Sequence, residues 1–318
     1  MGGEVIVVGD GVIGLTTAVE LAERGRRVRM WTREPAEATT SAVAGALWWP
    51  YRIEPAALVG AWSLTSLRVY EELATRPEET GVRLVPGVQS GVSPAALGPW
   101  ARELAGMVRE AAPGERPAGV ATGVRARLPL IDMPAHLGWL RARFEAAGGT
   151  VELRTAGSLD EASAEAPVVV NCTGLAAREL VPDPRLTPVR GQLVLVENPG
   201  VDSWFAAADE ASSELTYFFP QPGRLVLGGT AVEGAWSTEP DPATAEAIVR
   251  RCARVRPEIA DAPILAHRVG LRPVRSGGVR LAAVPGPYGT RLVHNYGHGG
   301  AGVTVAWGCA RAAAELAG

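Results

Sequence analysis

The sequence contains no lysine: all 31 basic residues among its 318 amino acids are arginines. This absence excludes Schiff-base catalysis, a Walker-type phosphate-binding lysine and a lysine general base. Cysteine is scarce as well, because only Cys172, Cys252 and Cys309 are present and none belongs to a C-x-x-C pair. Their number and spacing predict neither a metal site nor a disulfide framework, and they fit a reducing cytoplasm.

Long apolar runs and an excess of one charge are also missing. No uncharged stretch is long enough to span a bilayer, and no basic leader precedes the apolar run that begins at Val5. The formal net charge is -3, with 31 basic and 34 acidic residues spread along the chain. We therefore expect an untargeted, cytoplasmic protein that binds neither membranes nor nucleic acid, with the oligomeric state, including a homodimer, left open.

The chain does have the material for a large core, since 47% of its residues are hydrophobic and 20% are charged. Its start predicts a strand at residues 4–8, a helix from Val12 to about Arg24 that ends at Gly25, and a second strand at 27–32. Strands that are apolar throughout are typical of parallel sheets. We therefore predict an α/β fold with a Rossmann-like, doubly wound sheet.

Further along, two sequence textures alternate. Helical stretches at 62–75 and 100–111 are separated by Pro and Gly, and short strands with Pro-Gly turns between 193 and 229 indicate an antiparallel sheet. A strand at 168–170 and a helix at 303–316 return to the parallel pattern. We predict a discontinuous FAD- or NAD-binding domain that comprises residues 1–55, 135–180 and 265–318. Residues 56–134 and 181–264 are predicted to form an interleaved α+β substrate domain with a mostly antiparallel sheet.

Residues Gly9 to Gly14 form a G-x-G-x-x-G motif between the first strand and the first helix. Backbone amides and the positive end of the helix would face a pyrophosphate there, and the glycines allow close approach. Glu34 follows the second strand, where a carboxylate bonds a ribose hydroxyl, and Arg33 is placed to stack on or bond the adenine. The motif predicts dinucleotide binding, with a tight turn in an ordinary α/β domain as the alternative.

Two further segments fit a bound nucleotide, although each is equally compatible with a purely structural role. The strand from Val168 ends in the small-residue turn Thr173-Gly174, which suits a backbone packed against a nucleotide. Residues 39–41 offer three hydroxyl groups for phosphates, and the small residues 44–46 would let a flat ring lie close.

Near the C-terminus, residues 294–304 place four glycines before a helix whose amides would face an anionic oxygen of a reduced flavin. With this segment the sequence resembles the D-amino acid oxidases, an FAD-dependent family that oxidises D-amino acids to imino acids and passes the electrons to oxygen. The resemblance spans nearly the whole chain. It rests on Val8–Leu15, Trp49-Pro50-Tyr51, Val170–Gly174, Arg190-Gly191-Gln192, Gly270–Arg275 and His294–Gly300.

The resemblance implies non-covalently bound FAD. It implies that Arg272 and Tyr217 bind the substrate carboxylate, and that the backbone carbonyl near Gly300 binds the amine. Its implied cofactor contacts are Gly9, Gly11, Val12, Ile13, Gly14, Arg33, Glu34, Thr39, Thr40, Ser41, Gly45, Ala46, Leu47, Thr173, Gly174, Arg272, Gly297, Gly299, Gly300, Gly302, Val303 and Thr304.

These residue types suit the expected chemistry. A guanidinium matches a carboxylate through two parallel hydrogen bonds and stays charged at any working pH. With carboxylate and amine both held, only one enantiomer directs its Cα hydrogen at flavin N5, so orientation is the main contribution of the protein. We expect no side-chain base, and we expect His294 and His298 to have structural roles. The products would be an imino acid, then a 2-oxo acid and ammonia, with O2 reduced to hydrogen peroxide.

Departures from the family pattern indicate a preference for neutral or apolar D-amino acids. Ser213 stands in a shortened segment where relatives carry a lid tyrosine, and Ala301 replaces a tyrosine found in many relatives, so both are candidate pocket residues. Relatives specific for acidic substrates are expected to place an extra arginine after Thr230. Here Glu233, if it faces the pocket, would repel acidic side chains.

Several alternatives stay open: a glycine- or sarcosine-type amine oxidase or a D-aspartate oxidase on the same fold, a nicotinamide-dependent dehydrogenase, and a flavoprotein without catalytic activity. The absence of lysine argues against the sarcosine type, whose members resemble one another in using a lysine near the flavin for the reaction with oxygen.

Overall fold

The computed structural model describes residues 3–50, 52–104, 106–117, 120–208 and 214–318. The predicted strand–helix–strand unit is present as β1 (Glu4–Val8), α1 (Val12–Glu23) and β2 (Arg27–Thr32), with β1 and β2 in parallel. It opens a six-stranded sheet in the order β14-β15-β7-β1-β2-β6, in which only the pair β14–β15 is antiparallel. The other strands are β6 (Thr150–Leu153), β7 (Val168–Asn171), β14 (Arg280–Pro285) and β15 (Arg291–Tyr296).

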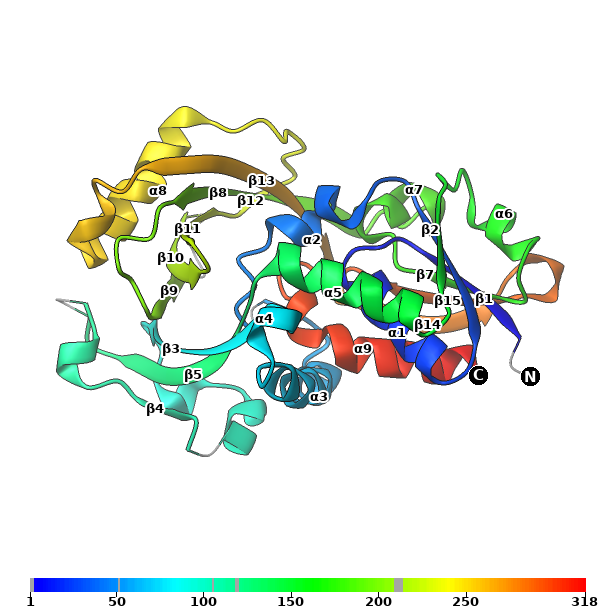
Figure 1. Cartoon of the computed structure of the whole chain (residues 1–318), viewed down its shortest axis with the longest axis horizontal. Helices are drawn as coiled ribbons and strands as arrows, with labels where there is room; N and C mark the ends of the chain where they lie inside the picture. Colours follow the sequence, from blue (N-terminus) through cyan, green and yellow to red (C-terminus); the bar gives the residue numbers. More distant parts are fainter. Residues whose placement is uncertain (1–2, 51, 105, 118–119, 209–213) are drawn as a thin grey trace.

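Both faces of this sheet are covered, which explains why its strands are apolar throughout. Val5 and Val7 belong to the core that includes α1, α5 and α9, whereas Ile6 and Val8 pack with α6 on the opposite face. Figure 1 shows these helices on the two sides of the sheet. Their bounds are α5 (Met133–Ala146), α6 (Leu159–Ser163) and α9 (Gly302–Ala317).

A second, nine-stranded sheet has the order β12-β8-β11-β10-β9-β3-β5-β4, and β13 pairs with β8. All of its pairs are antiparallel except β3–β9, as predicted for the mostly antiparallel sheet. The strands are β3 (Val82–Ser90), β4 (Val108–Glu110), β5 (Gly123–Ile131), β8 (Leu186–Val196), β9 (Trp204–Ala208), β10 (Glu214–Gln221), β11 (Arg224–Thr230), β12 (Val232–Glu233) and β13 (Ile264–Arg275).

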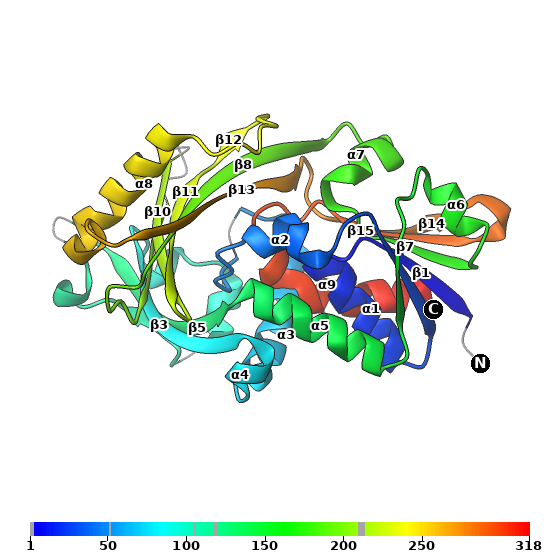
Figure 2. The ribbon, with the colours of Figure 1, turned by 45° about the horizontal axis from the view of Figure 1, so that its top comes forward.

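Strand alternation gives the larger sheet two different faces. Phe218 and Leu227 pack with Ile248 of α8 (Pro242–Val255), which lies against the sheet in Figure 2. The neighbours Tyr217 and Phe219 point the other way and line a cavity. One face is therefore closed by a helix, and the other is available for a ligand.

One strand joins segments that the sequence analysis assigned to different domains, and one expected helix is not found. Residues 264–275 form β13 of the larger sheet, although they fall almost entirely in the 265–318 segment assigned to nucleotide binding. The helix expected at 100–111 is wrong, because a short 3-10 helix at Pro99–Leu104 is followed by Gly106 at φ 90° and strand β4. The apolar Val108 pairs with Ala126 of β5 instead of continuing a helix.

The remaining elements are short connections and one long helix. They are α2 (Thr40–Val43), α3 (Ala56–Leu73), α4 (Pro77–Thr80) and α7 (Ala177–Leu180), with 3-10 helices at Ala36–Ala38, Pro94–Ala96, Pro113–Glu115, Gly174–Ala176, Pro257–Ile259 and Pro287–Gly289.

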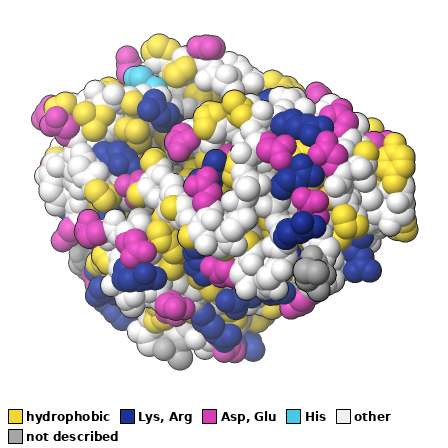
Figure 3. Space-filling model, turned by 45° about the vertical axis from the view of Figure 1, so that its right-hand side comes forward, with side chains coloured by type: hydrophobic (Ala, Val, Ile, Leu, Met, Phe, Trp, Pro, Cys, Tyr) yellow, Lys and Arg dark blue, Asp and Glu magenta, His cyan; other side chains and the backbone are white. Residues whose placement is uncertain are grey.

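The surface carries both signs of charge in close mixture. On the face in Figure 3, Arg and acidic side chains are interleaved. Arg29, for example, lies 3.0–3.1 Å from carboxylate oxygens of Glu4, Glu152 and Glu165. Among the helices that the structure describes, none combines the length and the apolar character needed to cross a bilayer.

Candidate active site

A cavity of about 660 Å³ lies between the two sheets and receives residues from both. At one end it is bounded by the segments that follow β1, β2 and β7, and at the other by β8, β10 and β13. Most of the residues expected at a cofactor or substrate line it. They are Gly9, Gly11, Val12, Ile13, Arg33, Glu34, Thr39, Thr40, Ser41, Gly45, Ala46, Leu47, Thr173, Gly174, Tyr217, Arg272, Gly299, Gly300, Gly302, Val303 and Thr304.

The glycine motif brings helix α1 directly onto the end of β1. Gly9 has φ 102°, and a Cβ on it would lie 2.6 Å from the carbonyl oxygen of Cys172. A Cβ on Gly14 would lie 1.8 Å from the carbonyl oxygen of Gly9. Side chains at either position would push the helix N-terminus away from the cavity, where its amides can face a phosphate. The Ser41 hydroxyl accepts a 3.0 Å hydrogen bond from the amide of Val12 and so ties residues 39–41 to this turn.

Arg33 and Glu34 mark one end of the cavity, and the structure adds residues there that the sequence did not indicate. Arg154 follows β6, and its guanidinium lies 3.6 Å from the ring centroid of Trp31. Both residues line the cavity together with residues 155–157. Because β2 and β6 are parallel neighbours, the residues that follow them meet at one edge of the sheet. The position of Arg154 directly after a predicted strand was the signal in the sequence that could have found it.

Asp10, inside the glycine motif, is a second residue that sequence reasoning passed over. Its side chain is buried, and Oδ1 accepts a 2.7 Å hydrogen bond from the Thr32 hydroxyl. Oδ2 has no hydrogen-bond partner among the described residues. Burial raises the pKa of this carboxyl group above its usual value.

At the opposite end, Arg272 and Tyr217 each lie across a glycine. A Cβ on Gly191 would lie 2.4 Å from Arg272 Nη2, and a Cβ on Gly228 would lie 1.9 Å from Tyr217 Cζ. Arg272 Nη1 donates a 2.9 Å hydrogen bond to the carbonyl of Thr230, two residues after the glycine that the Tyr217 ring covers. Glycines on the neighbouring strands therefore leave room for both side chains. The guanidinium has further N–H groups that can donate hydrogen bonds to a ligand.

The wall near Arg272 and Tyr217 is mostly apolar. Trp49 lies in an edge-to-face contact with Trp100, with ring centroids 5.4 Å apart, and its carbonyl accepts a 2.9 Å hydrogen bond from the Thr304 hydroxyl. Tyr217 stacks on Phe219 at 4.7 Å. The lining residues of this wall that the sequence did not suggest are Trp49, Gln89, Leu193, Ala206, Ala207 and Leu215.

Some expected site residues do not line the cavity. Gly14 serves the packing of α1, Gly297 has φ 87° and packs on Arg275, and Ala301 is buried at the start of α9. Glu233 is exposed on β12 and is not part of the lining, so the structure gives no support to repulsion by this carboxylate. Ser213 lies outside the described residues, as does Tyr51.

The two histidines of the C-terminal segment are buried. His294 Nδ1 accepts a 3.3 Å hydrogen bond from the Asn171 side chain, and burial together with the nearby Arg280 lowers its pKa to about 4. His298 lines the cavity, and burial lowers its pKa to about 3. Both rings are therefore neutral near pH 7.

Metal and thiol groups offer little chemistry in the described part of the chain. No cluster of three His, Cys, Asp or Glu side chains is found there that would hold a metal ion. All three cysteines are free and buried, and burial raises the pKa of Cys172, which lines the cavity, to about 12. This thiol is therefore protonated and unreactive at neutral pH.

The residues present fit a dinucleotide such as FAD. The glycine turn leaves open a space that any Cβ would fill, and the cavity has the size of a cofactor site. The N-terminal end of the long helix α9 faces the cavity through Gly302 and Val303. A parallel sheet whose first turn carries the glycine motif, beside a second and mostly antiparallel sheet that lines the same cavity, defines the class of dinucleotide-binding proteins.

Comparison with known proteins identifies the family. The family model of FAD-dependent oxidoreductases matches residues 4–316, and the chain belongs to this family. The chain is 67% identical over 315 residues to a D-amino-acid oxidase of Streptomyces coelicolor, covering 99% of this chain and 97% of that one. It is 51% identical over 313 residues to a D-amino-acid oxidase of Rubrobacter xylanophilus, with coverage of 98% and 95%.

The fold is also shared with solved structures of low sequence identity. A glycine oxidase from Geobacillus kaustophilus superposes with a TM-score of 0.79 at 20% identity, covering 99% of this chain and 95% of that one. The predicted α/β fold and FAD as the cofactor are therefore confirmed.

Proposed function

We propose that the protein oxidises neutral D-amino acids to imino acids, which hydrolyse to 2-oxo acids and ammonia, while O2 is reduced to hydrogen peroxide. The observation that carries the proposal is that Arg272 and Tyr217 of the larger sheet line the same cavity as the glycine motif. The names of its bacterial relatives support the same activity.

Each part of the chain has a distinct task in this proposal. The six-stranded sheet and its helices hold FAD, and the larger sheet, including β13, holds the substrate. Arg272 pairs with the substrate carboxylate, Tyr217 donates a hydrogen bond to it, and the backbone near Gly300 accepts one from the amine. Bound FAD supplies the two-electron acceptor that is reoxidised by O2.

Stereoselectivity follows from these contacts. Carboxylate and amine occupy two fixed directions from Cα, and the apolar wall with Trp49 receives the side chain. The Cα hydrogen of one enantiomer then points toward the cofactor, and that of the other points away. Since His294 and His298 are neutral and buried, we assign neither of them a proton-transfer role.

We propose neutral side chains because of the charges at this end of the cavity. Among the described lining residues contributed by the larger sheet, Arg272 is the one cation; the others are apolar apart from Gln89 and the hydroxyl group of Tyr217. Arg33 and Arg154 lie at the end of the six-stranded sheet. A second carboxylate, as in D-aspartate, would enter this wall without a partner, which is unfavourable.

The test is the visible spectrum of the purified holoprotein under anaerobic conditions, recorded with D-alanine, D-valine, D-aspartate, glycine, sarcosine and L-alanine in separate cuvettes. We expect D-alanine or D-valine to bleach the oxidised-flavin band, and L-alanine and D-aspartate to leave it. Bleaching by glycine or sarcosine alone would contradict the substrate assignment. A colourless protein that FAD does not reconstitute would contradict the flavoenzyme assignment.

A further inference from the structure

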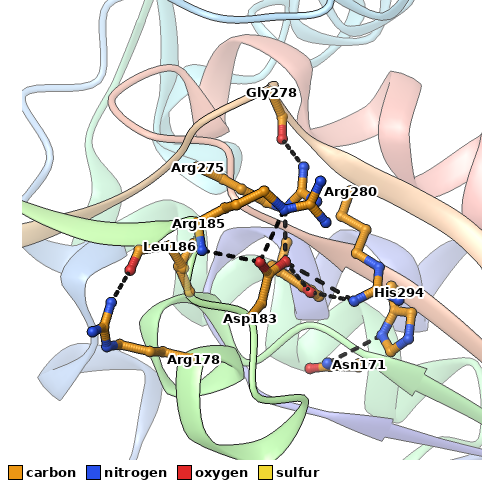
Figure 4. Close-up of polar contacts among 10 residues, drawn as sticks. Asn171, Arg178, Asp183, Arg185, Leu186, Arg275, Gly278, Arg280 and His294 are labelled. Atoms are coloured by element: carbon orange, nitrogen blue, oxygen red, sulfur yellow. Dashed lines mark hydrogen bonds and ion pairs between the residues drawn. The ribbon is translucent and has the colours of Figure 1, made fainter.

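The buried carboxylate of Asp183 lies between the two sheets. Two segments of the chain pass from one sheet to the other beside it. One crossing leads from β7 through α7 to β8 and contains Asp183. The other leads from β13 to β14 and contains Arg275 and Arg280. Figure 4 shows the side chains from both crossings converging on the carboxylate of Asp183.

The contacts of Asp183 are short and shielded from water. Oδ2 accepts a 2.7 Å hydrogen bond from Arg275 Nε and a 2.8 Å bond from the Tyr296 hydroxyl. Oδ1 accepts bonds from the amide and Nε of Arg185 at 3.2 Å, and Arg280 Nη1 donates to the Tyr296 oxygen at 2.8 Å. The side chains of Asp183 and Arg275 are only 3% and 6% exposed, so a mobile surface pair is excluded.

Burial by itself would raise the pKa of Asp183, but hydrogen bonds from Arg275 and Tyr296 outweigh it and lower the pKa below its usual value. The group is therefore a carboxylate at neutral pH. Its removal would leave the buried guanidinium group of Arg275 without its counter-charge.

The partners of Asp183 lead directly into both halves of the active site. Arg275 is the last residue of β13, the strand that carries Arg272. Tyr296 ends β15, immediately before the glycine loop that starts at Gly297. A Cβ on Gly297 would lie 2.8 Å from Arg275 Cβ, so the strand end and the loop are already in contact.

Backbone hydrogen bonds continue this connection. The amide of Gly299 donates to the carbonyl of Pro273 at 2.9 Å, and Val274 forms a β-bridge with His298. The guanidinium of Arg275 also donates to the carbonyl of Gly278, which closes the turn after β13. The position of the Arg272 strand relative to the loop 297–300 is therefore fixed by one carboxylate and the backbone pairs beside it.

We propose that Asp183 is a positioning residue, which sets the placement of the carboxylate anchor Arg272 relative to the glycine loop at the cofactor through Arg275 and Tyr296. The inference rests on the proposed function, because it assumes that Arg272 binds the substrate. Asp183 itself does not line the cavity. Its effect falls on the alignment of the bound substrate, whereas the local contacts of Arg272 with Thr230 and Gly191 stay intact.

The experiment compares the holoenzyme with its Asp183→Asn variant in two measurements. The first is the limiting rate of anaerobic flavin reduction by D-alanine. The second is the dissociation constant of propionate, which has the carboxylate but no amine, from the change it causes in the flavin absorption band. We expect the reduction rate to fall by about 10- to 100-fold, as for a displacement of reacting atoms near 1 Å. We expect the propionate constant to stay within about threefold.

A matched control separates positioning from general stability. Asp132 forms a similar ion pair, 2.7 Å from Arg224 with its side chain 11% exposed, and it does not line the cavity. Asp132→Asn should lower the melting temperature but leave the reduction rate within about twofold. Should Asp183→Asn fail to fold, Tyr296→Phe removes one of the two bonds to Oδ2 and should slow reduction at least about threefold with propionate binding kept.

Reduction of the Asp183→Asn or Tyr296→Phe holoenzyme at the wild-type rate would overturn the inference. So would a loss of propionate affinity equal to the loss of rate, because the defect would then lie in binding. Failure of the proposed function is a different result, since it shows in the wild-type protein, as the absence of flavin reduction by any D-amino acid.

Discussion

Single residues decide the chemistry of this site chiefly by the space that they leave. Arg272 and Tyr217 occupy positions where any Cβ on Gly191 or Gly228 would collide with them. An arginine anchor is suited to this end of the cavity because its planar fork can bond a carboxylate while Nη1 still bonds the Thr230 carbonyl. A lysine would offer a point charge without that fixed orientation.

Replacement of Arg272 by Met should therefore lower kcat/KM for D-alanine by about 30- to 4000-fold, since loss of one partner of a buried charge pair costs about 2–5 kcal/mol. Steady-state oxygen consumption measures this loss. Arg268→Met is the matched control, because Arg268 lies exposed on the same strand and bonds only the neighbouring His267 carbonyl among the contacts described. A kcat/KM within tenfold of the wild type in Arg272→Met would refute the anchor.

At the scale of elements, the same residue type has opposite roles in two helices. Gly14 in α1 is enclosed, with the carbonyl of Gly9 1.8 Å from the position of a Cβ. Gly138 in α5 has nothing within 4 Å of that position and is exposed. The first glycine allows α1 to start at the cavity, whereas the second only makes its helix more flexible.

Alanine at these two positions should therefore act in opposite directions. Gly138→Ala should stabilise the fold by about 0.5–1 kcal/mol with FAD affinity unchanged. Gly14→Ala should destabilise it by about 1–3 kcal/mol and weaken FAD binding at least about tenfold, because the helix must move from β1. Denaturant unfolding and FAD fluorescence titration give the two quantities. Equal FAD affinity in both variants would contradict this reading of the motif.

For the whole molecule, the buried histidines link folding to pH. His136 is fully buried between Tyr70 and Trp139, its Nδ1 donates to the Thr80 carbonyl, and burial lowers its pKa to about 4. His294 and His298 have pKa values lowered to about 4 and about 3. An unfolded chain binds protons at these sites below pH 6.5, whereas the folded chain does not.

The folded protein should therefore lose stability as the pH falls from about 6.5 toward 4, by up to about 1.4 kcal/mol per pH unit for each of the three histidines. Well above pH 6.5 the histidines are neutral in both the folded and the unfolded chain, so their contribution to stability no longer varies with pH. Unfolding free energies measured in denaturant between pH 7.5 and pH 4.5 test the slope. His136→Gln should lower this slope by up to about 1.4 kcal/mol per pH unit, which corresponds to one proton. An unchanged slope in this variant would contradict a lowered pKa of His136.

Local features were predicted well from the sequence. The βαβ unit and its glycine motif were found because strand, turn and helix lie within about 30 contiguous residues and their periodicity does not depend on distant partners. The helix expected at 100–111 was wrong, because that periodicity competed with a strand pairing to β5. Strand β13 was missed, because its pairing with β8 joins segments far apart in the chain.

The candidate site divides in the same way. The glycine motif predicted dinucleotide binding, and the family resemblance carried by the motifs in their order along the chain implied FAD and nominated Arg272 and Tyr217. The floor of glycines, the Trp49 wall and Arg154 over Trp31 were not predicted, since each depends on which strand lies next to which. The role of Asp183 was equally invisible, because its partners come from another crossing between the sheets.

By itself, the sequence determined the nucleotide-binding half, the FAD-dependent family and the residue types available for chemistry, because these depend on short contiguous segments and on composition. Only the tertiary structure decided that Arg272, Tyr217 and the glycine loop share one cavity. Their meeting requires the register of long antiparallel strands and the crossings between two sheets. Those are set by packing between distant segments, which no local pattern records.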